Sequence, residues 1–92
     1  MTLKEFEASE GNEFSGALLA LWWDARGDWS RAHQVAQDVE GRDGAWVHAY
    51  LHRKEGNSEN AAYWYRQARK SVESGELRKE WESIVTDLLS RR

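Results

Sequence analysis

Apolar residues recur along this chain with the period of an α-helix. The spacing is clearest near the C-terminus, where six apolar side chains follow one another at intervals that suit one helix face: Leu77, Trp81, Ile84, Val85, Leu88 and Leu89. These side chains form one stripe, and we expect the charged residues between them, including Arg78, Glu80 and Glu82, to face solvent. The pattern therefore predicts an amphipathic helix over residues 75–90, with Ser74 as its N-cap.

Glycines and capping residues divide the middle of the chain into further helices. Gly27 and Gly56 each follow an apolar stretch with helical spacing, and good N-cap residues come directly after them: Asp28 after the first, and Asn57 or Ser58 after the second. Glycine commonly ends helices because it adopts the left-handed conformation without strain. One helix is thus predicted to end and another to begin at each of these two places.

Shorter sequence motifs predict the remaining loop and a further short helix. Residues 40–44 contain two glycines and are predicted to form a loop, with Asp43 as the N-cap of the helix that follows. Thr2 and Glu5 have the spacing of a capping box, which predicts a short helix near the N-terminus. No segment alternates between apolar and polar residues for long enough to indicate a strand. The predicted fold class is all-α.

The middle of the chain contains an internal repeat. A shift of 29 residues, from position 27 to position 56, superposes residues of the same kind: Ala20 on Ala49, Gly27 on Gly56, Asp28 on Asn57, and Ala32 on Ala61. Small residues allow two helices to cross closely, and the glycine and the cap form the turn between them. The pattern therefore predicts a helix–turn–helix hairpin that occurs twice.

This repeat resembles the tetratricopeptide repeat. The second unit has the family's small, glycine, alanine, aromatic and alanine positions: Ala49, Gly56, Ala61, Tyr65 and Ala68. The first unit lacks the aromatic residue and reads Ala20, Gly27, Ala32, Ala36 and Val39. The period is also shorter than the 34 residues of that family. Because such folds usually need at least three units, the resemblance implies that the C-terminal helix caps the open end.

A second resemblance covers the stretch Trp46–Gly56 and the aromatic triplet Tyr63–Tyr65, which are similar to a group of short microbial proteins of uncharacterised function. That resemblance implies no activity. We expect one domain similar to the tetratricopeptide repeat over residues 1–92. Its expected parts are a short N-terminal segment (1–12), a first hairpin (13–40), a second hairpin (43–70) and a capping helix (75–90).

Composition limits the classes of function. The sequence has no Cys, which excludes disulfides, thiolate metal sites and cysteine nucleophiles. Its 13 Lys and Arg residues are outnumbered by 16 Asp and Glu residues, for a net charge of −3, whereas a nucleic-acid-binding surface needs a basic excess. The longest apolar run, Ala17–Trp23, is too short to cross a bilayer. We therefore expect a soluble cytoplasmic protein that binds neither nucleic acid nor membrane.

Three residues of the second hairpin form a candidate binding face. Trp46, Tyr50 and Arg53 are spaced so that they share one side of a helix. Aromatic rings beside a guanidinium suit a peptide or a carboxylate-bearing ligand, because they combine stacking area with a bidentate donor. The tetratricopeptide resemblance implies that Asp24 lies across a concave groove from them. We predict a protein- or peptide-binding module with these four residues as its site; alternatively, the rings pack against a neighbouring helix.

Three histidines suggest an alternative function. His48 and His52 have the spacing of two metal ligands on one helix, and His33 on the preceding helix would supply a third. Ala49 follows His48, so the metalloprotease motif is absent. The repeat register places both residues toward the hairpin partner, where a hydrogen-bonded structural histidine is common. The alternative hypothesis is therefore a small metal-binding protein or metal-dependent enzyme. The favoured hypothesis, a protein- or peptide-binding module, requires neither metal nor cofactor.

No arrangement of a nucleophile, a base and an orienting group emerges from the sequence, so we do not expect an enzyme. Trp22 and Trp23 are adjacent and point about 100° apart on a helix, so one narrow core stripe does not bury both. One of them is expected to line a groove or a partner surface. The third hypothesis is a homo-oligomeric structural unit, which would bury its remaining exposed aromatic residues between subunits.

Overall fold

All of residues 1–92 are described by the computed structural model, and they form six α-helices, one short 3₁₀ helix and no strand. In chain order the elements are α1 (Leu3–Ala8), η1 (Gly11–Glu13), α2 (Gly16–Ala25), α3 (Trp29–Gln37), α4 (Gly41–Glu55), α5 (Ser58–Ala68) and α6 (Leu77–Ser90). The prediction of an all-α fold is confirmed. No helix combines the length and the apolar character that crossing a bilayer requires.

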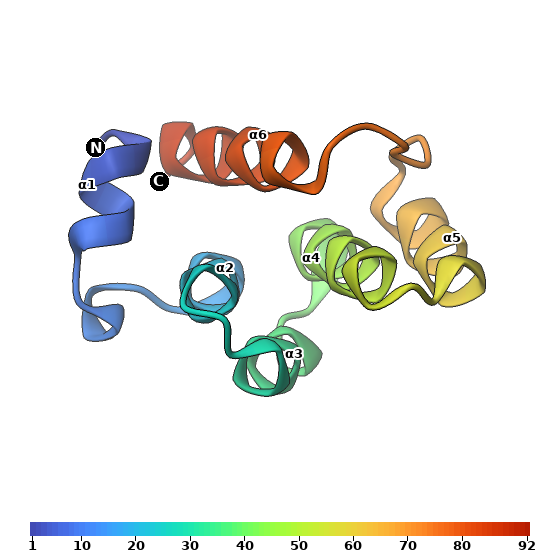
Figure 1. Cartoon of the computed structure of the whole chain (residues 1–92), viewed down its shortest axis with the longest axis horizontal. Coiled ribbons are helices and arrows are strands. Elements are labelled where there is room, and N and C mark those ends of the chain that lie inside the picture. The colour runs from blue at the N-terminus through green and yellow to red at the C-terminus, as the bar shows by residue number, and fades with distance from the viewer.

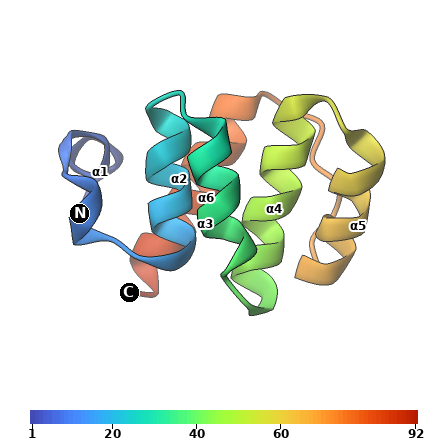
Figure 2. The ribbon, with the colours of Figure 1, turned by 90° about the horizontal axis from the view of Figure 1, so that it is seen from below.

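Four helices form a row that the last helix crosses. Helices α2, α3, α4 and α5 lie side by side in chain order (Figure 2). Helix α6 passes over the side of this row formed by α2 and α4, and α3 lies on the other side (Figure 1). Helix α1 packs against α2 and α6 at one end of the molecule, so the two termini are close together. The face shared by α2 and α4 is therefore covered by α6.

The turns between α2 and α3 and between α4 and α5 have nearly the same conformation. Gly27 and Gly56 have φ angles of 79° and 89°, in the left-handed region that favours glycine. Asp28 and Asn57 then cap the next helix, each accepting a hydrogen bond from the backbone N–H three residues later, at 3.0 and 3.4 Å. Both predicted glycine turns and both predicted caps are confirmed.

The core combines small residues from the row with large ones from α6. The four repeat alanines are buried: Ala20, Ala32, Ala49 and Ala61. From α6, the Trp81, Ile84 and Val85 side chains are buried in the main apolar cluster together with Leu21 of α2 and Leu51 of α4. Burial of several large side chains is the dominant stabilising term in a small domain, so α6 belongs to the core.

Two predicted helix starts were wrong. Helix α4 begins at Gly41 and not after Asp43, because the Asp43 carboxylate binds the Arg91 guanidinium at 2.8 Å and does not cap its own backbone. Helix α6 begins at Leu77 and not directly after Ser74. In that segment the Glu73 carboxylate accepts the backbone N–H groups of the next two residues, at 3.1 and 2.9 Å, and holds the chain in a bend before the helix.

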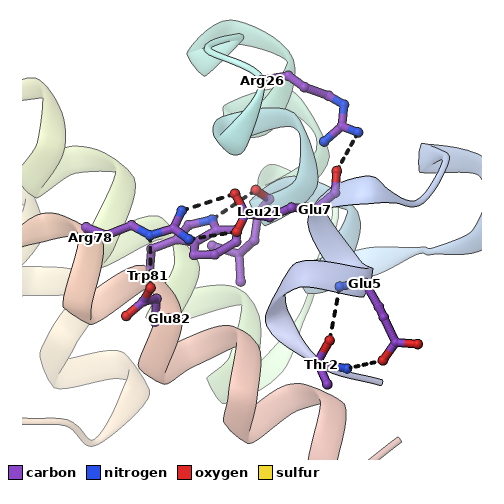
Figure 3. A network of polar contacts seen from close by, with 8 residues as sticks. All are labelled: Thr2, Glu5, Glu7, Leu21, Arg26, Arg78, Trp81 and Glu82. Carbon is purple, nitrogen blue, oxygen red and sulfur yellow. Dashed lines mark hydrogen bonds and ion pairs between the residues drawn. The ribbon is translucent and has the colours of Figure 1, made fainter.

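Helix α1 is fixed by its own cap and by its apolar side chain. Thr2 and Glu5 form the predicted capping box, with hydrogen bonds of 2.8 and 3.1 Å (Figure 3). The Phe6 ring is fully buried, with its centroid 4.8 Å from that of Phe14 and 5.8 Å from that of Trp81. A helix of six residues is not stable by itself, so these tertiary contacts hold it in place.

Polar contacts also connect α1 to both of its neighbours, as Figure 3 shows. Arg78 of α6 binds the Glu7 carboxylate at 2.7 Å and lowers the pKa of that carboxyl. Arg26, just after α2, donates to the backbone carbonyl of Glu7 at 2.8 Å. Beside this network, the Trp81 indole N–H donates to the Leu21 carbonyl at 3.0 Å, which fixes α6 against α2.

Gly44 in α4 is predicted to be the glycine least tolerant of substitution, because a Cβ there would lie 2.0 Å from the Val39 carbonyl oxygen. We predict that Gly44→Ala lowers the free energy of unfolding by about 2 kcal/mol or more, since backbone is forced apart. Gly75→Ala is the control, because its Cβ would meet only the flexible end of Glu73. Chemical denaturation with equal midpoints for the two variants would contradict the prediction.

Candidate functional site

The structure brings two of the four predicted site residues together in its interior. The Tyr50 hydroxyl donates to Asp24 Oδ2 at 2.8 Å, and the Lys54 ammonium lies 2.9 Å from Asp24 Oδ1. Asp24 is 4% exposed, and burial beside this carboxylate raises the pKa of Tyr50. Both carboxylate oxygens therefore have partners within the chain. The pair lies at a small hollow of about 200 Å³ whose wall includes Trp81 of α6.

The third predicted residue, Arg53, is also engaged by α6. Its Nη1 lies 2.7 Å from Glu80 Oε1, and its Nη2 donates to the Gly75 carbonyl. The other Glu80 oxygen accepts a hydrogen bond from the Tyr65 hydroxyl of α5. Glu80 is only 6% exposed, so its predicted position on the solvent face was wrong. A buried carboxylate needs such partners, and α4 and α5 provide them.

Arg53 is predicted to contribute to stability. Arg53→Met would leave the Glu80 carboxylate buried with no cationic partner, so we expect the free energy of unfolding to fall by about 3 kcal/mol. Arg31→Met removes a surface pair at 3.6 Å and should cost less than about 1 kcal/mol. Urea unfolding of both variants measures the difference. Equal losses would show that the pair with Glu80 is not structural.

Trp46, the fourth predicted residue, lies apart from the other three. It lines a cleft of about 300 Å³ between the start of α4, the end of α5 and the end of α6. We call this the Trp46 cleft; its other charged lining residues are Arg42, Asp43, Arg69, Lys70, Asp87 and Arg91. The Lys70 ammonium lies 4.1 Å from the centroid of the Trp46 ring. Predicting this cleft from sequence would require knowing that three helix ends meet here.

The Trp46 cleft has an excess of positive charge. Arg91 is paired with Asp43 at 2.8 Å and with Asp87 at 2.7 Å, which uses both carboxylates of the lining. Arg42, Arg69 and Lys70 form no ion pair, so four cations face two anions and the excess is two. This surplus occurs in a chain whose net charge is −3. The positive charge is therefore concentrated locally at this cleft, and the overall composition does not reveal it.

Arg69 also has an unusual backbone conformation. It ends α5 with a φ of 59°, and it is the only residue other than glycine in the left-handed region. An L-residue in this conformation costs about 1 kcal/mol, which glycine would avoid. Arg69 therefore lines the Trp46 cleft at a position where glycine would have the lower backbone energy.

The six tryptophans fall into two groups according to their indole N–H. Those of Trp22, Trp29 and Trp81 donate to backbone carbonyls at 2.9 to 3.0 Å. The other three make no hydrogen bond within the chain, and each lines a separate surface hollow: Trp23, Trp46 and Trp64. Of the adjacent pair Trp22 and Trp23, the first is buried and the second is half-buried beside a hollow of about 420 Å³.

The three histidines converge as a cluster of rings, in which His33 meets the other two edge-on. The centroid of His33 lies 5.3 Å from those of His48 and His52, which lie 6.0 Å from each other. None of their side chains makes a hydrogen bond, and the buried His52 Nδ1 has no partner, so the expected hydrogen-bonded histidine was wrong. No three His, Asp or Glu side chains of the chain form a set that could hold a metal ion.

Two tryptophans enclose this histidine cluster. Trp29 stacks on His33 at 4.8 Å, and Trp64 stacks on His48 at 4.4 Å. Burial, together with the neighbouring His33 and His52, lowers the pKa of His48 to about 4. Burial, and after it the neighbouring His33, also lowers the pKa of His52. His48 is therefore neutral at pH 7.

Acid is predicted to destabilise the protein through His48. The unfolded chain binds a proton at its ordinary pKa of 6.5, and the folded chain does so only near 4. Stability is therefore fully present above pH 6.5 and falls as the pH drops toward 4. For this group alone we expect a loss of about 2 kcal/mol between pH 7 and pH 5. Urea unfolding at both pH values measures it; a His48→Gln variant with an undiminished pH dependence would contradict the assignment.

No protein-family model, no curated protein and no solved structure matches this chain. What is established is the class, a small all-α domain of six helices. Trp46, which the sequence predicted as a site residue, shares its cleft with Arg42, Arg69 and Lys70, which no sequence pattern singled out. The adjacent pair of cations at the end of a predicted helix was the available signal.

Proposed function

We propose that this protein is a binding module for acidic polypeptide segments, which it holds at the Trp46 cleft. The observation that carries the proposal is the group of three cations without carboxylate partners, Arg42, Arg69 and Lys70, around a tryptophan with a free indole N–H. Tryptophan and arginine are the residues most enriched among binding hot spots. Carboxylates of a ligand would pair with the guanidinium groups in bidentate fashion.

We retain the predicted function, binding of a protein or peptide, but propose the Trp46 cleft as the site. Asp24, Tyr50 and Arg53 are occupied by contacts within the chain, whereas Trp46 is available. We interpret the pairs α2–α3 and α4–α5 as shortened hairpins of the tetratricopeptide type with α6 as their cap. In this interpretation, α6 fills the side on which such repeats present a groove, and the ligand binds at the end of the row.

The lining of the Trp46 cleft favours a polypeptide over a nucleic acid. Asp43 and Asp87 lie among its cations, so the positive charge is divided and does not form the continuous stripe that a phosphate chain follows. The net charge of −3 adds no long-range attraction for a polyanion. An acidic peptide carries separated carboxylates, which suit separated cations. The strained arginine at position 69 supports a role in binding, since such strain gathers at functional sites.

The test is a titration with a capped hexaglutamate peptide, followed by the amide and indole signals in a nitrogen–proton correlation spectrum. We predict that the Trp46 indole signal moves. Arg69→Gly should weaken binding about threefold to tenfold, because one cation is lost. The same variant should gain up to about 1 kcal/mol of stability, because its left-handed backbone is relaxed. Loss of binding by a more stable protein separates function from folding.

Lys79→Ala is the matched control, because it removes one positive charge from an exposed position on α6 outside the cleft. Its affinity for hexaglutamate should equal that of the wild type. A Trp46 signal that stays in place, or an equal weakening by both variants, would overturn the proposal. Tighter binding of an oligothymidylate than of hexaglutamate would point to a nucleic-acid ligand and would overturn it as well.

A further inference from the structure

A second cleft adjoins the first. It has a volume of about 470 Å³ and lies between the end of α3, the start of α4 and α5. Arg42 and Arg69 line both clefts and so form the wall between them. We call the second one the Trp64 cleft; the side chains that matter for its chemistry are Gln37, Glu40, His48, Trp64 and Gln67.

The Trp64 cleft is rich in hydrogen-bonding groups that have no partner in the chain. Gln37 and Gln67 are exposed and make no side-chain hydrogen bond, and the Trp64 indole N–H is also free. A carboxamide has one acceptor and two donor hydrogens, which complement the C=O and N–H of a peptide group. His48 stacks on Trp64 at 4.4 Å, and its neutral ring also offers one donor and one acceptor.

Charge distinguishes the two clefts. Arg42 and Arg69 line both clefts, but Glu40 lines only the Trp64 cleft, so the lining there carries one net positive charge and that of the Trp46 cleft carries two. The two carboxylates of the Trp46 cleft are already paired with Arg91, but Glu40 makes no ion pair. Because its carboxylate is unpaired and its amide and indole groups are free, the Trp64 cleft is better suited than the Trp46 cleft to uncharged polar groups, of which the peptide backbone is the commonest in a polypeptide ligand.

Building on the proposed function, we infer that the acidic peptide crosses the Arg42–Arg69 wall and that its main chain is hydrogen-bonded in the Trp64 cleft by Gln67 and the Trp64 indole. Carboxylates on one side of the wall and peptide groups on the other would then be recognised together. This arrangement favours a polypeptide over a polycarboxylate without a peptide backbone. Only the polypeptide has peptide groups that reach the Trp64 cleft while its carboxylates occupy the Trp46 cleft.

The experiment uses the full chain and the capped hexaglutamate peptide. The indole signals of Trp46 and Trp64 report on the two clefts separately, and that of Trp23 is an internal reference on another surface. We expect both cleft signals to move along one binding curve while the Trp23 signal stays in place. Gln67→Ala should weaken binding about threefold to fivefold through loss of hydrogen bonds to the main chain.

Gln34→Ala is the matched control, because Gln34 is an exposed helical glutamine of α3 that lines neither cleft. Its affinity should be that of the wild type. A Trp46 signal that moves while Trp64 stays in place would overturn this inference and leave the proposed function standing. An affinity unchanged by Gln67→Ala would also overturn it. If neither signal moves, the proposed function fails, and this inference fails with it.

Discussion

The buried carboxylate of Glu80 is the constraint around which the rest of the structure is arranged. It lies on α6, and it is bound by Arg53 of α4 and by the Tyr65 hydroxyl of α5. A carboxylate this deeply buried is tolerated only with such partners, so the position of α6 over the row is specified chemically as well as by packing. Because α6 stays there, the face of α2 and α4 is core, and any ligand must bind elsewhere.

The sequence predicted the local features of this fold and missed those that depend on distant partners. Gly56 and Asn57 were identified correctly because a turn and a cap involve only neighbouring residues. Glu80 was misplaced because it lies between the apolar positions of the C-terminal stripe, and nothing local shows that Arg53 faces it. Asp43 was misread as a cap for a similar reason, since its partner, Arg91, lies at the far end of the chain.

The candidate site shows the same division. Spacing on one helix predicted a shared binding face for Trp46, Tyr50 and Arg53. In the structure Tyr50 binds Asp24 and Arg53 binds Glu80, which leaves only Trp46 at a surface cleft. The hydrogen-bonding state of each indole separates structural from available tryptophans, and that information exists only in the folded chain. The histidines illustrate the opposite outcome: ligand spacing is present, yet the three rings cluster between two tryptophans and form no metal set.

We propose that the ligand binds at the end of the helix row while α6 remains in place. Paramagnetic broadening by a spin-labelled hexaglutamate peptide tests this proposal most directly, because the effect falls steeply with distance. We predict broadening of the backbone signals of Arg42 and Lys70, with those of Arg53 and Glu80 unaffected. Broadening centred on Arg53 and Glu80, accompanied by displaced α6 signals, would show that the ligand replaces α6 and would contradict the proposal.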